Sequence, residues 1–479
     1  MAVLLVLLPW AFSGTAFAVP SNRWRPCLLP LAGLAHLVLT VMALREPALT
    51  GLNGWLSLDP LGKLVLGLIS VMFLLCSCYA PGYLAERPER NNRVLCSCLM
   101  LSLGMMTLIV LSHHLGLMWV AMEATTLVSA PGLYFNHNAR SLEATWKYLL
   151  ICSVGIALAL LGSLFIAYSA VYVGLESTLM FDELIRQAPQ LSKPWLHAAF
   201  ILLLVGYGTK MGLAPMHTWK PDAYGEAPGM IGALLAGCMT NCAFLAILRF
   251  VQIARAADER EFADRILVFV GLFSMAVAAV FLVRQRDFKR MLGYSSVEHM
   301  GILVLGVGLG GPACWAALLH MINNGLTKGV LFLSAGNIHR AYATKQTADV
   351  RGVLRRLPMS GAMLLLGFLA ITGLPPFAPF ISEFALLSAA FRQGHYWAGS
   401  LYASMLLVVF FGYGATVTGM VFGTPSPAAE NTKFRDSFAT CWPILAFAAL
   451  VLMLGLYLPP SIAELLNAAV SFVEMRPPG

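Results

Sequence analysis

The stretch KMGLAPMHTWKPDAYGEAP, residues 210–228, determines how the rest of the chain is interpreted. It follows directly on an apolar run, and a lysine such as Lys210 near the centre of a bilayer costs roughly 2.5–3.5 kcal/mol on insertion scales. Pro215 then removes a backbone hydrogen-bond donor, and two further prolines flank Asp222. A charged and interrupted membrane helix is typical of an ion or substrate site.

The composition is that of a membrane protein. Of the 479 residues, 59% are hydrophobic and 11% are charged, and the mean hydropathy is +0.76, far outside the range of soluble globular chains. Apolar segments of about twenty residues recur along the whole chain, so no soluble domain of ordinary size fits between them. The net charge is +8, but the basic residues stand in short loops, which indicates a membrane-topology signal and not a nucleic-acid partner.

We therefore expect an all-α polytopic membrane protein with about fourteen transmembrane helices in the lipid bilayer. The segment 359–392 is too long for one plain span and contains Pro375, Pro376 and Pro379, so we expect a second broken helix there. The predicted spans are residues 2–18, 27–45, 61–80, 93–111, 113–133, 145–173, 197–222, 226–253, 265–283, 294–310, 312–335, 359–392, 396–422 and 440–458.

The two broken helices, the seventh and the twelfth in this series, lie five spans apart. A repeated unit with an odd number of helices enters the membrane upside down in its second copy, so we expect two inverted five-helix repeats, residues 93–253 and 265–422. Residues 1–92 then hold the first three helices, and residues 440–479 hold the last helix and the tail. Loops after the odd-numbered helices carry about twice as many Lys and Arg as the others, which places both termini on the non-cytoplasmic side.

Four ionisable side chains inside the predicted spans form two pairs of an acid and a base along the chain. They are Glu123, Lys210, Lys328 and Glu383. Charges within a membrane are tolerated mainly when they pair or face a wet cavity, and the natural partner of Glu123 is Lys210. A lysine desolvated in a membrane binds its proton less tightly, and a nearby carboxylate restores that affinity. Moving the carboxylate would load or discharge the lysine, which is the physical requirement of a proton relay.

Other polar residues extend this line. His320, Asn324 and Lys328 recur at four-residue steps on one face of a helix, which favours a hydrated line over a structural histidine. Lys147 is a further candidate, although its side chain could instead extend to the membrane interface. The remaining candidates for proton transfer, of which the last two could act through water, are His217, Asn241 and His299.

Four motifs follow one another along the chain. They are Pro215-Met-His217-Thr-Trp219-Lys220-Pro221-Asp222-Ala223, Tyr294-Ser295-Ser296-x-x-His299-Met-Gly301, the run from Lys328 to Gly336, and Gly373-Leu-Pro375-Pro376 through Glu383-Phe384. Together they resemble the antiporter-like membrane subunits of respiratory complex I, a family that includes membrane subunits of group 4 nickel–iron hydrogenases and large subunits of multi-subunit cation/proton antiporters. The stretches ATWKYLLICSVGIALALLG and TKMGLAPMHTWKPDAYGEAP look most like its hydrogenase-4 component F branch, of the formate hydrogenlyase type.

The resemblance covers roughly helices 3 to 14 and implies a polar axis through a fourteen-helix fold. Two residues depart from the family pattern. Asn241 stands where many relatives have a lysine in the eighth helix, and Asn324 replaces a second histidine in the eleventh. The residues that match the family's ionisable positions in helices five, six, seven, eleven and twelve are Glu123, Lys147, Lys210, His320, Lys328 and Glu383.

The resemblance implies a proton-translocating subunit of a membrane-bound oxidoreductase complex in a bacterial or archaeal cytoplasmic membrane. Its partners would be other membrane subunits and a peripheral cytoplasmic redox arm. No nucleotide loop, haem motif or metal-ligand cluster is visible in the sequence, so nickel–iron, iron–sulfur or flavin centres are expected only in those partners. Two alternatives stay open: sodium/proton exchange, against which the scarcity of carboxylates argues mildly, and a structural membrane anchor with a non-functional axis.

Overall fold

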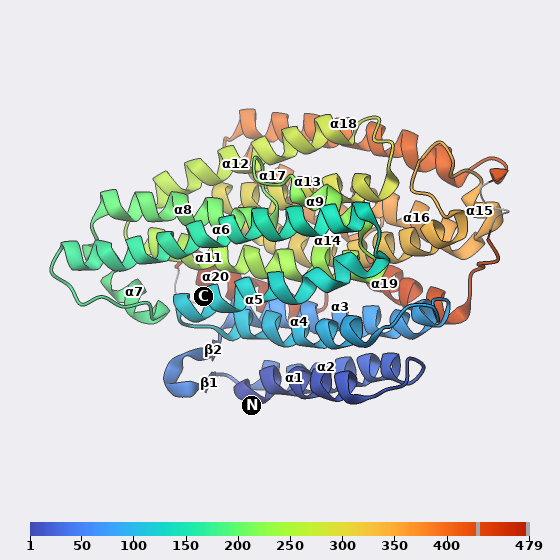
Figure 1. Cartoon of the computed structure of the whole chain (residues 1–479). Helices are drawn as coiled ribbons and strands as arrows, with labels where there is room; N and C mark the ends of the chain where they lie inside the picture. The colour runs from blue at the N-terminus through green and yellow to red at the C-terminus, as the bar shows by residue number, and fades with distance from the viewer. Residues whose placement is uncertain (428–431, 476–479) are drawn as a thin grey trace.

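The computed structural model describes residues 1–427 and 432–475, which form a stack of packed helices. In Figure 1 the helices run roughly side by side, from α1 (Ala2–Ala18) and α2 (Leu28–Arg45) at the bottom to α18 (Tyr396–Val421) at the top. The N-terminus lies in the left-hand half of that view.

The remaining elements follow in chain order. An antiparallel hairpin joins β1 (Leu49–Gly51) to β2 (Leu56–Leu58), with Leu49 opposite Leu58. The helices up to the middle of the chain are α3 (Pro60–Ala85), α4 (Arg93–Leu111), α5 (Leu115–Leu133), α6 (Ala139–Tyr172), α7 (Phe181–Gln187), α8 (Lys193–Met211), α9 (Trp219–Glu226), α10 (Gly229–Leu234) and α11 (Thr240–Ala256). The later helices are α12 (Arg260–Leu282), α13 (Phe288–Leu309), α14 (Pro312–Tyr342), α15 (Val353–Arg356), α16 (Pro358–Ile371), α17 (Ala378–Arg392), α19 (Phe438–Leu456) and α20 (Pro460–Val473). A π-helical turn, Leu235–Met239, links α10 to α11.

Nine helical segments in the described part of the chain are long and apolar enough to cross a membrane. The helices α1, α16 and α20 are apolar but shorter. This is the fold of an integral, almost entirely helical membrane protein. The count of fourteen spans and the inverted repeats stay predictions, and residues 476–479 of the predicted tail lie outside the described residues.

Polar caps explain why two helices begin earlier than their apolar runs. The α6 helix starts at Ala139 because the Asn138 side chain accepts a hydrogen bond from the Ser141 backbone at 2.7 Å. The α13 helix starts at Phe288 because Asp287 accepts two backbone N–H groups of its first turn. Both starts precede the predicted ones at residues 145 and 294, because the first turns are polar and hydropathy alone does not include them.

The structure confirms both predicted helix breaks. The first lies at residues 212–218, where Gly212 adopts a φ of 86° and ends α8. The second lies at residues 372–377, between α16 and α17. Pro215, Pro375 and Pro376 stand within these breaks, but Pro379 lies in the first turn of α17, where a missing N–H is no loss. Pro379 was therefore wrongly predicted to contribute to the interruption.

The helices that carry Asn241 and His299 lie in the interior. The most apolar windows of α10–α11 and α13 are entirely buried inside the protein, whereas those of α6 and α18 are largely exposed on its outside. The short helix α9, which follows the first break, packs against both α6 and α13. It therefore contacts a helix from each side of the chain's midpoint.

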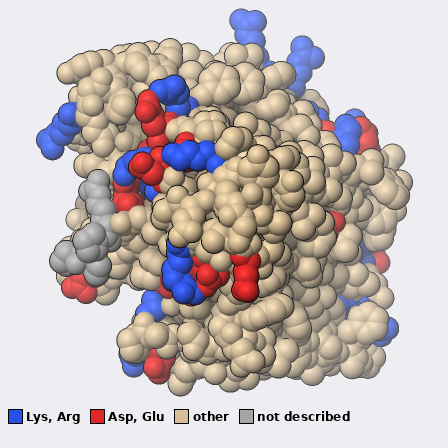
Figure 2. Space-filling model, turned by 90° about the vertical axis from the view of Figure 1, so that its left-hand side faces the viewer, with Lys and Arg blue, Asp and Glu red and all other residues tan. Residues whose placement is uncertain are grey.

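Charged residues at one end of the molecule occur in mixed groups. Figure 2, which looks onto the left-hand end of Figure 1, shows basic and acidic side chains side by side among uncharged surface. At the loop between α11 and α12, Lys193 and His197 each lie 2.7 Å from a carboxylate oxygen of Glu259. Pairing of this kind leaves no extended surface of one sign in that region.

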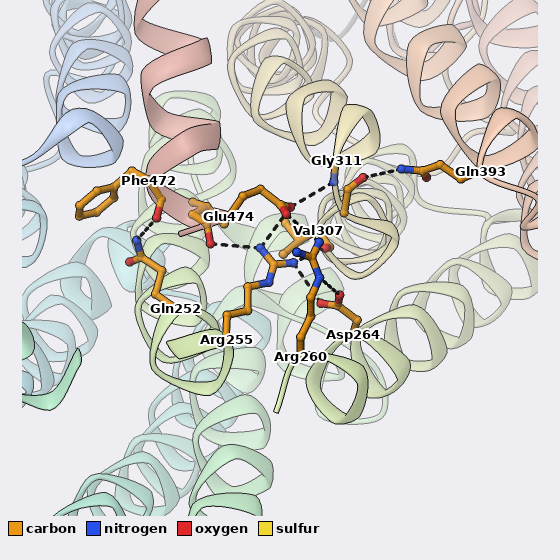
Figure 3. Close-up of polar contacts among 11 residues, drawn as sticks. Gln252, Arg255, Arg260, Asp264, Val307, Gly311, Gln393, Phe472 and Glu474 are labelled. Carbon is orange, nitrogen blue, oxygen red and sulfur yellow. Dashed lines mark hydrogen bonds and ion pairs between the residues drawn. The ribbon is translucent and has the colours of Figure 1, made fainter. Parts of the chain in front are cut away.

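The helix α20 was not predicted, although Ile462, Leu465, Leu466, Ala469 and Val473 recur at helical spacing. It packs against α3 and α14, and the residue after it, Glu474, is held in a network of polar contacts (Figure 3). The contacts to its carboxylate come from Arg260 Nη2 at 2.6 Å, the Gly311 backbone N–H at 3.1 Å and Arg255 Nη1 at 3.3 Å. Arg255 also donates to Asp264 at 3.0 Å and to the Val307 carbonyl at 2.9 Å.

Truncation of Glu474 should destabilise the protein. Glu474→Ala removes one of the two carboxylates that pair with the buried guanidinium of Arg255, and Asp264 remains as the other. Removal of the sole partner of a buried charge costs about 3–5 kcal/mol, so we expect a loss of more than about 1 kcal/mol but below that range. The control is Glu261→Ala, which removes the solvent-exposed pair with Arg265 and should cost less than about 1 kcal/mol. Thermal unfolding of the two variants in detergent measures the difference; equal melting temperatures would contradict the role assigned to Glu474.

Candidate functional site

Lys210 lies in the last turn of α8 and its side chain is completely buried. Its Nζ donates to two hydroxyl groups, Thr126 Oγ1 and Tyr148 OH, each at 2.8 Å. No carboxylate oxygen lies within 4.0 Å of this nitrogen in the described structure. The buried ammonium is thus solvated by neutral hydroxyls and not by a direct ion pair.

Glu123 reaches Lys210 only through a hydroxyl. The carboxylate accepts from Ser153 Oγ at 2.7 Å and from Thr126 Oγ1 at 3.4 Å. Since the same Thr126 oxygen accepts from Lys210, it stands between the two charges. The expected pairing of Glu123 with Lys210 thus runs through the hydroxyl of Thr126, which lies one helical turn after Glu123 on α5.

A second group of polar contacts joins α13 to α14. Lys328 Nζ donates to Ser295 Oγ at 2.9 Å, and two turns earlier on α14 His320 Nε2 lies 2.9 Å from His299 Nδ1. His320 and Lys328 therefore both point toward α13. Asn324 lies between them on α14, and neither its amide oxygen nor its amide nitrogen has a hydrogen-bond partner among the described residues.

Glu383 lies beside the histidine pair. His320 Nδ1 is 3.0 Å from Ser382 Oγ, and Glu383 together with His299 and His320 offers three ligand atoms that all lie within 4.8 Å of one another. Three such groups could hold a metal ion, which the sequence alone did not indicate. The two imidazoles already bond to each other, however, so this arrangement equally forms a hydrogen-bonded path from α13 to α17.

The carboxylate of Glu383 folds back over the second break. A Cβ atom added to Gly373, which has a φ of 69°, would lie 2.2 Å from Glu383 Oε2. Only a glycine accommodates both that backbone conformation and that contact. The break thus provides the space in which the Glu383 carboxylate lies.

Three predicted candidates lie apart from these contacts. Lys147 is half exposed and pairs with Glu143 at 2.6 Å and with Asp222 at 3.0 Å, so it belongs to the surface and not to the buried line. His217 is buried in the first break with its ring 6.3 Å from that of Tyr294. Asn241 is buried, and its amide donates to a carbonyl of its own helix, that of Gly237, at 2.8 Å.

Sequence reasoning missed three residues of the site. Tyr148, the residue after Lys147, is the one that reaches Lys210. Glu298 is buried on α13, and its Oε2 lies 4.0 Å from His299 Nε2; it stands at a variable position of the Tyr294 motif, although a carboxylate there is as unusual as Glu123. Lys220 is buried in α9; it stands at the end of the predicted span 197–222 and was not singled out from its motif.

A methyl group at the second break should displace Glu383. We expect Gly373→Ala to lower the free energy of unfolding by about 1–3 kcal/mol more than Gly394→Ala, because overpacking adds to the backbone strain that both share. Gly394 is a matched control, since its φ is 80° and nothing lies within 4 Å of the added methyl. Chemical unfolding in detergent compares them, and equal losses would contradict the Glu383 contact.

The comparisons with known proteins agree with this arrangement. The family model described as NADH:quinone oxidoreductase/Mrp antiporter, TM, matches residues 112–410. A hydrogenase-4 component F homolog of Methylacidiphilum infernorum is 37% identical over 75% of this chain and 75% of its own length. An NADH-quinone oxidoreductase subunit N of Desulforudis audaxviator is 26% identical over 98% of each chain.

A solved structure shares the whole fold. A chain of the membrane-bound sulfane sulfur reductase, an archaeal respiratory membrane complex, superposes with a TM-score of 0.88 at 20% identity, covering 99% of this chain and 97% of that one. At that identity the likeness shows the fold alone. The family match spans both groups of buried contacts, from Glu123 to Glu383. This chain belongs to the family of antiporter-like membrane subunits of complex I, group 4 hydrogenases and Mrp antiporters.

Proposed function

We propose that this chain translocates protons as an antiporter-like subunit of a membrane-bound oxidoreductase complex. The observation that carries the proposal is the contact between Lys210 and Glu123 through the Thr126 hydroxyl. A hydroxyl accepts one hydrogen bond while it donates another, so it can pass a proton between an amine and a carboxylate. A direct ion pair would hold both charges in place instead.

The second group supplies the same chemistry further along the chain. Lys328 is held by the Ser295 hydroxyl, and the His299 and His320 imidazoles form a short hydrogen-bonded path to Ser382, with a Glu383 oxygen within 4.8 Å of both imidazoles. Imidazoles and carboxylates exchange protons readily. Buried polar atoms without a protein partner, such as the Asn324 amide and Glu298 Oε2, are the groups that water would join to this line.

The redox chemistry is assigned to other subunits. The relatives named above are subunits of NADH-quinone oxidoreductases and hydrogenases, which supports partners that carry nickel–iron, iron–sulfur or flavin centres in a peripheral cytoplasmic arm. In this proposal their turnover changes the electrostatic field at Lys210 and drives proton release. The complex would lie in a bacterial or archaeal cytoplasmic membrane with both termini of this chain on the non-cytoplasmic side.

Two inverted five-helix repeats fit this function. Each half of the chain has one helix broken at a glycine with positive φ, Gly212 or Gly373, and prolines stand in both breaks. Each half also has a glutamate on an unbroken helix, the partly buried Glu123 on α5 and the buried Glu298 on α13. The proposed repeats, residues 93–253 and 265–422, would then contribute half of the proton path each.

Replacement of either Lys210 or Glu123 should strongly reduce proton transport. We expect Lys210→Ala and Glu123→Ala to lower proton translocation per electron transferred by about 100-fold, a typical contribution of one proton-transfer group. The measurement is acidification of vesicles that contain the intact complex, recorded together with its redox turnover. The control is Lys193→Ala, which removes a half-exposed surface pair.

Undiminished translocation in both variants would contradict the proposed function. If the variants disturb neither transport nor assembly while deletion of the chain abolishes assembly, the chain is a structural anchor with a non-functional axis.

The same preparation distinguishes protons from sodium. We expect translocation to be unchanged when sodium is replaced by potassium, because sodium prefers a cluster of oxygen ligands and the carboxylates Glu123 and Glu383 belong to separate groups of contacts. Transport that requires sodium, measured by isotope uptake, would instead identify a sodium/proton exchanger.

A further inference from the structure

Lys220 is a buried lysine for which the contacts described so far assign no role. It lies in the first turn of α9, directly after the first helix break, and its side chain is completely buried. The side chain folds back over the break, because a Cβ atom added to Gly212 would lie 2.4 Å from Lys220 Cδ and 2.9 Å from its Nζ. The Lys220 side chain thus lies against Gly212 at the first break, as the Glu383 carboxylate lies against Gly373 at the second.

The Lys220 ammonium is held by backbone carbonyls and an aromatic ring, without a carboxylate. Its Nζ donates to the Met211 carbonyl at 2.7 Å and lies 3.5 Å from the Ser296 carbonyl. The nearest ring is that of Tyr224, with its centroid 5.7 Å from the nitrogen. No carboxylate oxygen lies within 4.0 Å of Lys220 Nζ in the part of the chain that the structure describes.

These two carbonyls belong to residues that directly follow a member of each group of the site. Met211 is the residue after Lys210, and Ser296 is the residue after Ser295, which accepts from Lys328 at 2.9 Å. The Lys220 amine therefore contacts the backbone beside both groups. Its helix is held across the same junction, because Asp222 pairs with Lys147 of α6 at 3.0 Å and with Arg290 of α13 at 2.6 Å.

Asn241 does not fill this position. Its amide nitrogen donates within its own helix, its amide oxygen has no hydrogen-bond partner among the described residues, and an amide neither gains nor loses a proton in the physiological range. An asparagine here therefore leaves the junction to a titratable group, and Lys220 is a buried lysine whose Nζ reaches carbonyls on both sides.

We propose that Lys220 is the proton carrier that joins the Glu123–Lys210 group to the Lys328–Glu383 group. The inference rests on the proposed function. A proton leaves the Lys210 ammonium and the neutral Lys220 amine takes it. Lys220 then releases it toward Ser295 and the neutral Lys328 amine, so that one proton crosses the junction and the total charge of the three lysines is unchanged at each transfer.

Three substitutions test whether Lys220 carries a proton or only donates a hydrogen bond that caps the end of α8. Lys220→Met has no titratable group and should lose at least about tenfold in translocation per electron. Lys220→Arg keeps the positive charge and the donor to Met211 but holds its proton at all relevant pH values, so it should be equally impaired. Lys220→His can still exchange a proton and should retain part of the transport, with a pH dependence different from that of the unaltered complex.

The measurements use vesicles with the intact complex, and co-purification of the partner subunits checks assembly. Normal translocation in assembled Lys220→Arg or Lys220→Met would overturn the proposal. If the complex with Lys220→Arg does not assemble, Lys220→Met and Lys220→His are compared with each other. Equal transport with the same pH dependence in these two variants would overturn the proposal. Loss of transport in Lys210→Ala together with normal transport in Lys220→Met would reject the carrier role of Lys220 alone and leave the proposed function standing.

Discussion

Three buried lysines, Lys210, Lys220 and Lys328, set the constraint on which the rest of the site depends. A buried ammonium needs acceptors for its protons, and none of these three nitrogens has a carboxylate oxygen within 4.0 Å in the described residues. Hydroxyl groups and backbone carbonyls take that place. Such acceptors stabilise the charge without a fixed counter-charge, so the proton on each lysine can leave.

The two helix breaks follow from the same constraint. An unbroken helix satisfies its own carbonyls and has no room beside its backbone for a long charged side chain. At Gly212 and Gly373 the chain turns with a positive φ. The side chains of Lys220 and Glu383 lie against the backbone there, in the space that a Cβ atom would fill. The first break also frees the Met211 carbonyl, which accepts from Lys220. The interruptions therefore create the polar surfaces that a membrane interior otherwise lacks.

Local composition was enough to predict the breaks and most of the charged residues. Proline and lysine are so costly in an apolar segment that Lys210 and the two breaks stand out in the sequence. Which groups meet depends on helix packing, so the bridging role of Thr126 and the contact of Tyr148 with Lys210 were not predictable. Lys220 was missed because it stands at the end of a predicted span, where a lysine can reach the membrane interface, and only the packing of α9 against α6 and α13 reveals its burial.

The most direct test of a continuous proton path is a cryo-EM structure of the intact complex at a resolution that shows water. A path predicts ordered waters that join the Asn324 amide and Glu298 to Lys328, and further waters between Lys210 and Lys220. A dry interior, with these polar atoms bonded only to protein groups and apolar side chains filling the space between the lysines, would contradict it.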